Sequence, residues 1–201
     1  VHWLTQIAPQ IIDQNTLPTS LRERVREFES YGLSLYILNT TALDIPSVCI
    51  AMINEQGDIP QVVISGASAL TMEEAIDDAI TEAMSLSGVF YVDTEEFALP
   101  QSPIEPFVSP INKYTRQSYW RGRESVAHFR WFISGEKTSF TVASSNDIVS
   151  LKSEKEDISS CVRALRRHGD EYIPIAYYPQ NSIQKKLGFY VVQVFIPKAF
   201  P

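Results

Sequence analysis

The chain has 201 residues, of which 44% are apolar and 20% are charged, and this composition is typical of a globular protein with a sizeable core. Its formal net charge of −7 and its isoelectric point near 5.0 argue against a general binder of nucleic acids or anionic membranes, because the summed field repels polyanions. No apolar stretch reaches the roughly 20 residues that span a bilayer, and two cysteines without a CxxC pair fit a reducing cytosol. We therefore expect a cytoplasmic protein that binds neither nucleic acid nor membrane.

The first part of the chain predicts a loop, a helix and three strands. We expect a loop over residues 9–18, followed by a charged amphipathic helix with Ser20 at its N-cap and Gly32 beyond its end. Apolar runs predict three strands at residues 33–38, 47–53 and 61–65. The connections between these runs are too short for a crossover helix, so at least part of the sheet is expected to be antiparallel.

The stretch from Gly66 to Gly88 predicts a glycine turn, GASA, that leads from the third strand into one long helix. Thr71 followed by Glu74 has the spacing of a capping box, so the helix is expected to begin at Met72. A buried stripe at helical spacing is predicted from Ala75, Ile76, Ala79, Ile80, Ala83 and Met84. This stripe leaves the other side of the helix for the charged residues.

Acidic residues stand four apart on that other side. Glu74, Asp78 and Glu82 line up one above another along the helix, and such like-charge pairs oppose a helix by roughly 0.2–0.5 kcal/mol each. Asp77 lies close beside them. A hard cation held by carboxylate oxygens, bringing phosphates with it, would reverse the sign of this interaction. A solvated acidic face is the other interpretation, because such faces are common, and the spacing leaves both open.

The second part of the chain differs from the first in composition. Residues 99–110 contain four prolines and predict a linker or an ordered loop. Helical segments are expected at residues 111–118 and 124–133, and a loop or short strand at residues 140–153. Residues 155–169 predict a helix ended by a glycine.

The last segments predict a βαβ unit. Strands at residues 172–177 and 189–197 flank a short helix that ends at Gly188, and this order is typical of parallel strands joined by a crossover helix. The whole pattern predicts an α/β (α+β) fold, with a mixed sheet of short antiparallel strand pairs, a packed acidic helix and the C-terminal βαβ unit. We divide the chain into a strand-rich part at residues 1–98, the proline-rich segment and a helical part with the βαβ unit at residues 111–201, within one domain.

Familiar catalytic motifs are missing from the sequence. It contains no GxGxxG or GxxxxGKS loop, no HExxH and no GxSxG elbow. His2, His128 and His168 are far apart, with no cysteine or acid at ligand spacing. The last of these is explained by the dipole at a helix C-terminus. Spacing alone therefore assigns no catalytic residue.

Three segments carry a resemblance to a known family. The first joins HWLTQIAPQIID to NTLPTSLRERVREFESYGLSLYILNTTALDIPSVCIAMI, the second is GASALTMEEAIDDAITEAMSLSG, and the third is KKLGFYVVQVFIPKAFP. They are similar to the "ID...LP" and "D-x-P" elements, the "eeAl..AltEa.Q.R" helix and the "GL.VvrViiPgl.P" strand of YcaO-type domains, in particular of the SagD-like branch found in thiazole/oxazole-modified peptide biosynthesis. The resemblance spans nearly the whole chain.

The resemblance implies an ATP-dependent enzyme of ribosomal peptide and bacteriocin biosynthesis. Members of the family phosphorylate a backbone amide oxygen, so that a Cys, Ser or Thr side chain closes to an azoline or sulfur gives a thioamide. Such chemistry suits magnesium held by carboxylates, since the metal neutralises phosphate charge. The implied partners are a precursor peptide or a partner biosynthetic protein, and the chain is compatible with a homodimer.

The resemblance also assigns site residues. Glu82 is carried over as the family's glutamate in the long helix, and together with Asp78 it is expected to bind the cofactors ATP and Mg²⁺. The implied metal ligands are Glu82, Asp78 and Glu74. No catalytic residue is assigned.

The chain departs from the family pattern in two ways. Ser85 and Ser87 stand where the helix usually has glutamine and arginine, and Asp78 stands where a basic residue is more usual, so a lower nucleotide affinity is expected. The family's "E-x-x-E-R" segment would lie before Val1. We therefore expect the chain to be the C-terminal part of a truncated YcaO domain, inactive alone but part of a cyclodehydratase-like parent. The alternatives are a degenerate module that binds a peptide or partner protein, and an acidic domain whose helix merely covers a sheet.

Overall fold

The computed structural model describes residues 5–54, 61–90, 126–127, 129–148, 153–169, 172, 174–177, 186–188 and 193–196. Within these residues the main sheet has the strand order β4-β3-β2-β1-β5, and β6 and β7 form a separate pair. The main strands are β1 Gln10–Ile12, β2 Leu33–Asn39, β3 Ser47–Asn54, β4 Val62–Ser68 and β5 Lys137–Thr138. The neighbours from β1 to β4 are antiparallel, whereas β5 runs parallel to β1. The predicted α/β fold with a mixed sheet is therefore confirmed.

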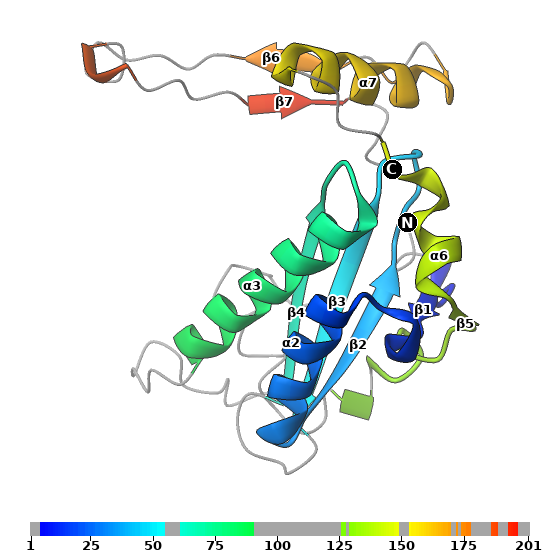
Figure 1. Ribbon diagram of the computed structural model, residues 1–201, viewed down its shortest axis with the longest axis vertical. Coiled ribbons are helices and arrows are strands. Elements are labelled where there is room, and N and C mark those ends of the chain that lie inside the picture. The colour runs from blue at the N-terminus through cyan, green and yellow to red at the C-terminus, as the bar shows by residue number, and fades with distance from the viewer. Residues whose placement is uncertain are drawn as a thin grey trace.

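The two faces of the sheet bury different cores. Helices α2 (Thr19–Ser30) and α3 (Met72–Phe90) both cover one face, as Figure 1 shows. Because successive residues of a strand point to opposite faces, Ile37 and Ile50 pack beneath these helices, whereas Leu38 and Ala51 pack with Phe129 on the other face. The period of two in the strands thus sets which face α3 covers.

The segment before α2 is more ordered than its sequence predicts. The expected loop at residues 9–18 contains β1 and a short 3-10 helix, η1 (Gln14–Thr16). The amide of Ile11 donates to the Glu136 carbonyl at 2.8 Å, and Ile12 is fully buried. The loop prediction was wrong because the partner strand β5 lies more than 120 residues away in sequence and local patterns do not show it.

Helix α2 confirms the predicted amphipathic helix but begins at Thr19, two residues earlier than a Ser20 N-cap implies. Pro18, rather than Ser20, occupies the N-cap position, and its side chain makes no hydrogen bond to the helix. Leu21, Val25 and Phe28 face the core. Gly32 lies beyond the helix as predicted, in a left-handed conformation with φ of 76° that glycine adopts without strain.

Helix α3 begins at Met72, as predicted, and Thr71 Oγ1 accepts the amide hydrogen of Glu74 at 3.2 Å. The predicted glycine turn was wrong, because Gly66 lies inside β4 and pairs with Cys49 of β3. A Cβ atom there would lie 3.2 Å from the Val48 carbonyl oxygen, so the glycine permits close strand approach rather than a turn.

Residues 140–146 of the serine-rich stretch after β5 are helical. Residues 140–153 were expected to form a loop or short strand, but they contain α6 (Phe140–Ala143) and the 3-10 helix η3 (Ser144–Asn146). Ser139 initiates α6 because its side chain accepts the amide hydrogen of Val142. In the predicted helix at residues 124–133, the Arg130 amide donates to the Val126 carbonyl. The predictions for residues 99–110 and 111–118 lie outside the described residues.

The C-terminal unit contains the predicted helix, α7 (Glu154–Arg166), capped by Ser153, with Gly169 beyond its end at φ of 138°. Strands β6 (Ile175–Tyr177) and β7 (Gln193–Phe195) are antiparallel, so the predicted parallel βαβ unit was wrong. Antiparallel pairing needs only a reversal of the chain, whereas parallel pairing needs a crossover that packs on the sheet. None of the helices in the described part of the chain has the length and hydropathy needed to cross a bilayer.

The C-terminal unit touches the main sheet at the β2–β3 connection. Asp44 Oδ2 lies 3.2 Å from Arg167 Nε and 3.1 Å from His168 Nε2. The sequence explained His168 by the helix dipole, and the structure adds this carboxylate partner. Residues from both sides of the proline-rich segment thus contact one another, and the division into parts at 1–98 and 111–201 stays a prediction.

Candidate functional site

The acidic side of α3 is held outward by the burial of its opposite side. The side chains of Ala75, Ile76, Ala79, Ile80 and Ala83 are fully buried against the sheet. Ser65 of β4 also donates a 2.7 Å hydrogen bond to the Ala79 carbonyl. Met84, predicted as part of the buried stripe, is instead 45% exposed and contacts α2. The helix therefore cannot rotate about its axis without exposing its apolar stripe.

A groove of about 870 Å³ opens at the N-terminal end of α3. It lies between the first turn of α2, the connection from β4 and the first two turns of α3. Its lining consists of Ser20, Leu21, Ala69, Leu70, Thr71, Glu73, Glu74, Asp77 and Asp78. The groove thus brings together two of the predicted ligands, Glu74 and Asp78, and adds two carboxylates that the sequence did not assign to the site.

Glu82, the third predicted ligand, lies one helical turn beyond the groove. It is exposed and is not part of the groove lining. Since residues four apart on a helix lie about 5–6 Å from each other, it extends the line that Glu74 and Asp78 begin. The role of these three residues as metal ligands stays a prediction.

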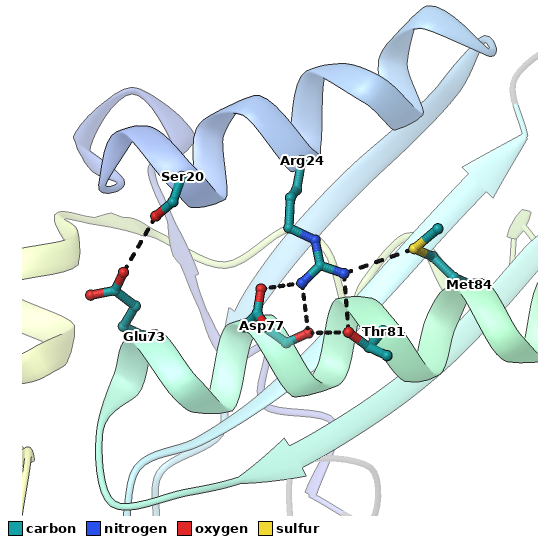
Figure 2. Close-up of polar contacts among 6 residues, drawn as sticks. All are labelled: Ser20, Arg24, Glu73, Asp77, Thr81 and Met84. Atoms are coloured by element: carbon teal, nitrogen blue, oxygen red, sulfur yellow. Dashed lines mark hydrogen bonds and ion pairs between the residues drawn. The ribbon is translucent and has the colours of Figure 1, made fainter.

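Two residues of α2, Ser20 and Arg24, contact the acidic side of α3, as Figure 2 shows. Ser20 Oγ donates to Glu73 Oε1 at 3.4 Å. Arg24 forms an ion pair with the Asp77 carboxylate and also donates to Thr81 Oγ1 at 3.0 Å. These contacts fix one wall of the groove to the other.

Asp147, distant in sequence, completes the start of α3. Its Oδ1 accepts the amide hydrogen of Met72 at 2.7 Å, and the amide of Ile148 donates to the Leu70 carbonyl at 2.7 Å. Burial raises the pKa of Asp147 above its ordinary value; the hydrogen bond from Met72 lowers it, and the charges of Glu74 and Glu73 raise it further. No local pattern could have predicted this cap, because 75 residues separate its two partners.

Removing the Asp147 carboxylate in two ways is expected to give opposite results. Asp147→Ala leaves the Met72 amide without its acceptor and should lower the free energy of unfolding by about 0.5–2 kcal/mol, as loss of a helix cap does. Asp147→Asn keeps an acceptor oxygen and removes a charge that Glu73 and Glu74 repel, so its stability near neutral pH should equal or exceed that of the wild type. Urea denaturation of the two variants measures the difference.

The pH dependence of stability in the same variants tests the effect of the Asp147 charge on folding. A carboxyl whose pKa is raised by folding favours the folded state below its ordinary pKa of 3.8, and this contribution is lost as the pH rises through the raised value. The asparagine variant lacks this loss. Its stability relative to the wild type should therefore increase as the pH rises from the ordinary pKa of 3.8 through the raised pKa of Asp147. Identical pH profiles for wild type and Asp147→Asn would contradict the assignment.

The two cysteines do not provide a nucleophile in the described structure. Burial raises the pKa of Cys49 to about 12, and burial also raises the pKa of Cys161, with a further increase from Asp157. A thiol with a raised pKa is a poor nucleophile near neutral pH. Neither cysteine is therefore assigned to the site.

The donor set of the groove fits a hard cation that arrives with phosphate. Among the described residues no three His, Cys, Asp or Glu side chains form a ready-made metal cage. Mg²⁺ rarely needs one, since it is usually held by one or two carboxylates together with substrate phosphates. The residues that line the groove include four carboxylates and no lysine or arginine, so a phosphate can approach favourably only with its metal.

Comparison with known proteins identifies the family. Over residues 1–199 the chain matches the family described as "YcaO cyclodehydratase, ATP-ad Mg2+-binding". The chain belongs to the YcaO family. A sequence comparison with curated proteins gives no match.

Solved structures of YcaO proteins share the fold of the chain. A structure titled "Heterocyclase in complex with substrate and Cofactor" has 18% identity and a TM-score of 0.66, over 98% of this chain and 24% of that one. YcaO from Methanopyrus kandleri bound with AMPPCP and Mg²⁺ has 17% identity and a TM-score of 0.64, over 97% and 46%. The E. coli microcin synthetase McbBCD complex with pro-MccB17 has 12% identity and a TM-score of 0.55, over 98% and 46%.

These comparisons support the family and the fold of the chain. The YcaO chain spans between about a quarter and a half of the length of these solved proteins. The identities support a shared fold, and the family description supports a relation to ATP- and magnesium-binding cyclodehydratases. The SagD-like branch and a C-terminal position within the domain stay predictions.

Proposed function

We propose that the chain is part of an ATP-dependent YcaO enzyme of the SagD-like branch that modifies the backbone of a ribosomally made precursor peptide, by cyclodehydration of Cys, Ser or Thr to azolines or by thioamidation. The observation that carries this proposal is the match to the YcaO family across residues 1–199. The groove at the start of α3 supports it, because its carboxylates suit a magnesium–phosphate ligand. The partner peptide, a cytoplasmic location and a homodimer belong to the same proposal.

In this proposal Asp78 and Glu74 hold the metal from the groove wall, and Glu82 extends the site along α3. When bound, magnesium and ATP would supply an electrophilic phosphoryl group for a peptide amide oxygen, with the metal neutralising phosphate charge. The chain's own part is to fix the carboxylates in place. The buried stripe of α3, the Ser65 bond to Ala79 and the Asp147 cap all restrict movement of the helix, and such preorganisation lowers the cost of binding.

The proposal is tested on the full-length protein with a candidate precursor peptide. We expect calorimetry to detect binding of ATP in the presence of Mg²⁺, and ATP hydrolysis to increase when the peptide is added. Mass spectrometry should then detect loss of one water per ring formed. Absence of nucleotide binding would overturn the proposal, whereas binding without turnover on any precursor peptide would favour the second candidate.

The second candidate is a YcaO module that binds a peptide or partner protein and has lost catalysis. The observation that favours it is at Ser85, where the family pattern has glutamine. Ser85 Oγ donates to the Thr81 carbonyl of its own helix at 3.2 Å, so this hydroxyl is used locally. The acidic side of α3 would then serve as a binding surface for a cationic partner.

A further inference from the structure

Arg24 lies across the acidic side of α3 and makes more contacts to it than an isolated surface ion pair would. Its guanidinium contacts the Asp77 carboxylate, the Asp77 carbonyl oxygen at 3.3 Å, Thr81 Oγ1 at 3.0 Å and Met84 Sδ at 3.8 Å, as Figure 2 shows. Its side chain is only 29% exposed. Thr81 Oγ1 in turn donates to the Asp77 carbonyl at 2.9 Å. The charge of Arg24 is therefore held at one place on α3.

The position of this charge matters because of what surrounds it. Four carboxylates line the groove, and among the ion pairs of the described residues the Arg24–Asp77 pair is the one that involves α3. A bare divalent cation is attracted by every unpaired carboxylate. A magnesium–ATP complex carries net negative charge, so each unpaired carboxylate beyond those that bind the metal repels it.

We propose that Arg24 is a specificity-determining residue of this site: by pairing with Asp77 it makes the groove accept an anionic metal–nucleotide complex in preference to a bare divalent cation. The inference rests on the proposed function, since it assumes that Mg²⁺ and ATP bind at the acidic side of α3. It assigns Asp77 to charge pairing and leaves Asp78 and Glu74 to the metal. A residue that only joined α2 to α3 would have no such preference.

The sign of the charge effect gives the test. In the full-length protein, Arg24→Ala should weaken binding of magnesium–ATP by about fivefold, the upper range for a partly exposed ion pair. The same change should tighten binding of Mn²⁺, used alone as a probe for the bare cation, by about the same factor. Asp77→Asn frees Arg24 and removes a negative charge, so it should tighten magnesium–ATP binding and weaken Mn²⁺ binding. Calorimetry measures both ligands.

Two further variants control for structure and for general charge. Arg24→Lys keeps the charge without the forked donor, so both affinities should stay within about twofold of the wild type. Arg22 contacts Thr19 on its own helix, so Arg22→Ala makes the same change of charge away from α3 and should leave the ratio of the two affinities unchanged.

The results distinguish a failure of the Arg24 assignment from a failure of the proposed function. If the wild type binds magnesium–ATP but Arg24→Ala behaves as Arg22→Ala does, or weakens both ligands alike, the role of Arg24 in specificity is refuted and the proposed function stands. If the wild type binds no magnesium–ATP, the proposed function fails and the Arg24 assignment fails with it. Weaker binding of magnesium–ATP with tighter binding of Mn²⁺ in Arg24→Ala, and the reverse in Asp77→Asn, would establish the role of Arg24 in specificity.

Discussion

Asp78→Asn is expected to weaken magnesium–ATP binding in the full-length protein by about tenfold to a hundredfold, the range typical of changes that disturb a metal site. Asp78 lies in the groove lining between Glu74 and Glu82 along α3. The substitution replaces a charged oxygen ligand by a neutral one of nearly the same shape. It also relieves two like-charge pairs, each of roughly 0.2–0.5 kcal/mol, so the melting temperature should stay the same or rise.

A loss of affinity together with a gain in stability is the signature of a functional acid rather than a structural one. Glu82→Gln should also weaken nucleotide binding if the site extends beyond the groove. It relieves one like-charge pair, with Asp78, whereas Asp78→Asn relieves two. Glu29 is exposed on the side of α2 away from Arg24, so Glu29→Gln makes the same charge change and should leave nucleotide affinity unaltered. A melting temperature lowered by several degrees in Asp78→Asn would assign this acid to folding instead.

A normal nucleotide affinity in Glu82→Gln, with loss in Asp78→Asn, would confine the site to the groove. The carry-over of the family glutamate to Glu82 would then be wrong. Normal affinity in both variants would favour the plain solvated acidic face that the sequence also allowed.

Local patterns in the sequence predicted the segment from α2 to α3 closely. The helix start at Met72 follows from the Thr71 cap, and the antiparallel strands follow from short connections between apolar runs. The outward acidic side of α3 follows from the helical period of the buried alanines and isoleucines. In each case the signal lies within one element or between neighbours, where spacing alone fixes the geometry.

Contacts between distant segments could not be predicted in this way. The stretch GASA, which begins at Gly66, has a composition typical of a turn, but pairing with β3 keeps Gly66 extended. Asp147 caps α3 from 75 residues away, and Arg24 reaches α3 from 53 residues away. The sequence therefore predicted which acids face outward, but not the second helix that forms a groove with them or the arginine that offsets their charge.

The antiparallel pairing of β6 with β7 illustrates the same limit. The order strand, helix, strand predicts a parallel unit, although the short helix predicted before Gly188 covers little of a sheet. Ile175 and Val194, on paired strands, are more than half exposed. Hydropathy therefore identified both strands but not their direction, which depends on the partner each one finds.

Gly135→Ala is expected to lower the free energy of unfolding by about 1–3 kcal/mol or more, as overpacking does where the backbone cannot yield. A Cβ atom at this position would overlap the Pro9 carbonyl oxygen and would lie 2.8 Å from the Pro9 carbonyl carbon. Relief would require separation of β5 from β1. That movement would break the bonds from the Ile11 amide to Glu136 and from the Asp13 amide to the Thr138 carbonyl, both 2.8 Å long.

Thermal denaturation of the full-length protein measures this effect, since 1 kcal/mol shifts the melting temperature of a domain of this size by about 2–4 °C. Gly66→Ala is the matched control. Its Cβ would lie 3.2 Å from the Val48 carbonyl oxygen. Among the described strands β4 is at the edge of the main sheet, so a small shift relieves the contact and the change should stay below about 1 kcal/mol. Equal stabilities of the two alanine variants would contradict the close approach of Gly135 to β1. Because the segment after β5 also carries Asp147, a destabilised β1–β5 pair should weaken the cap of α3 and, with it, the wall of the groove.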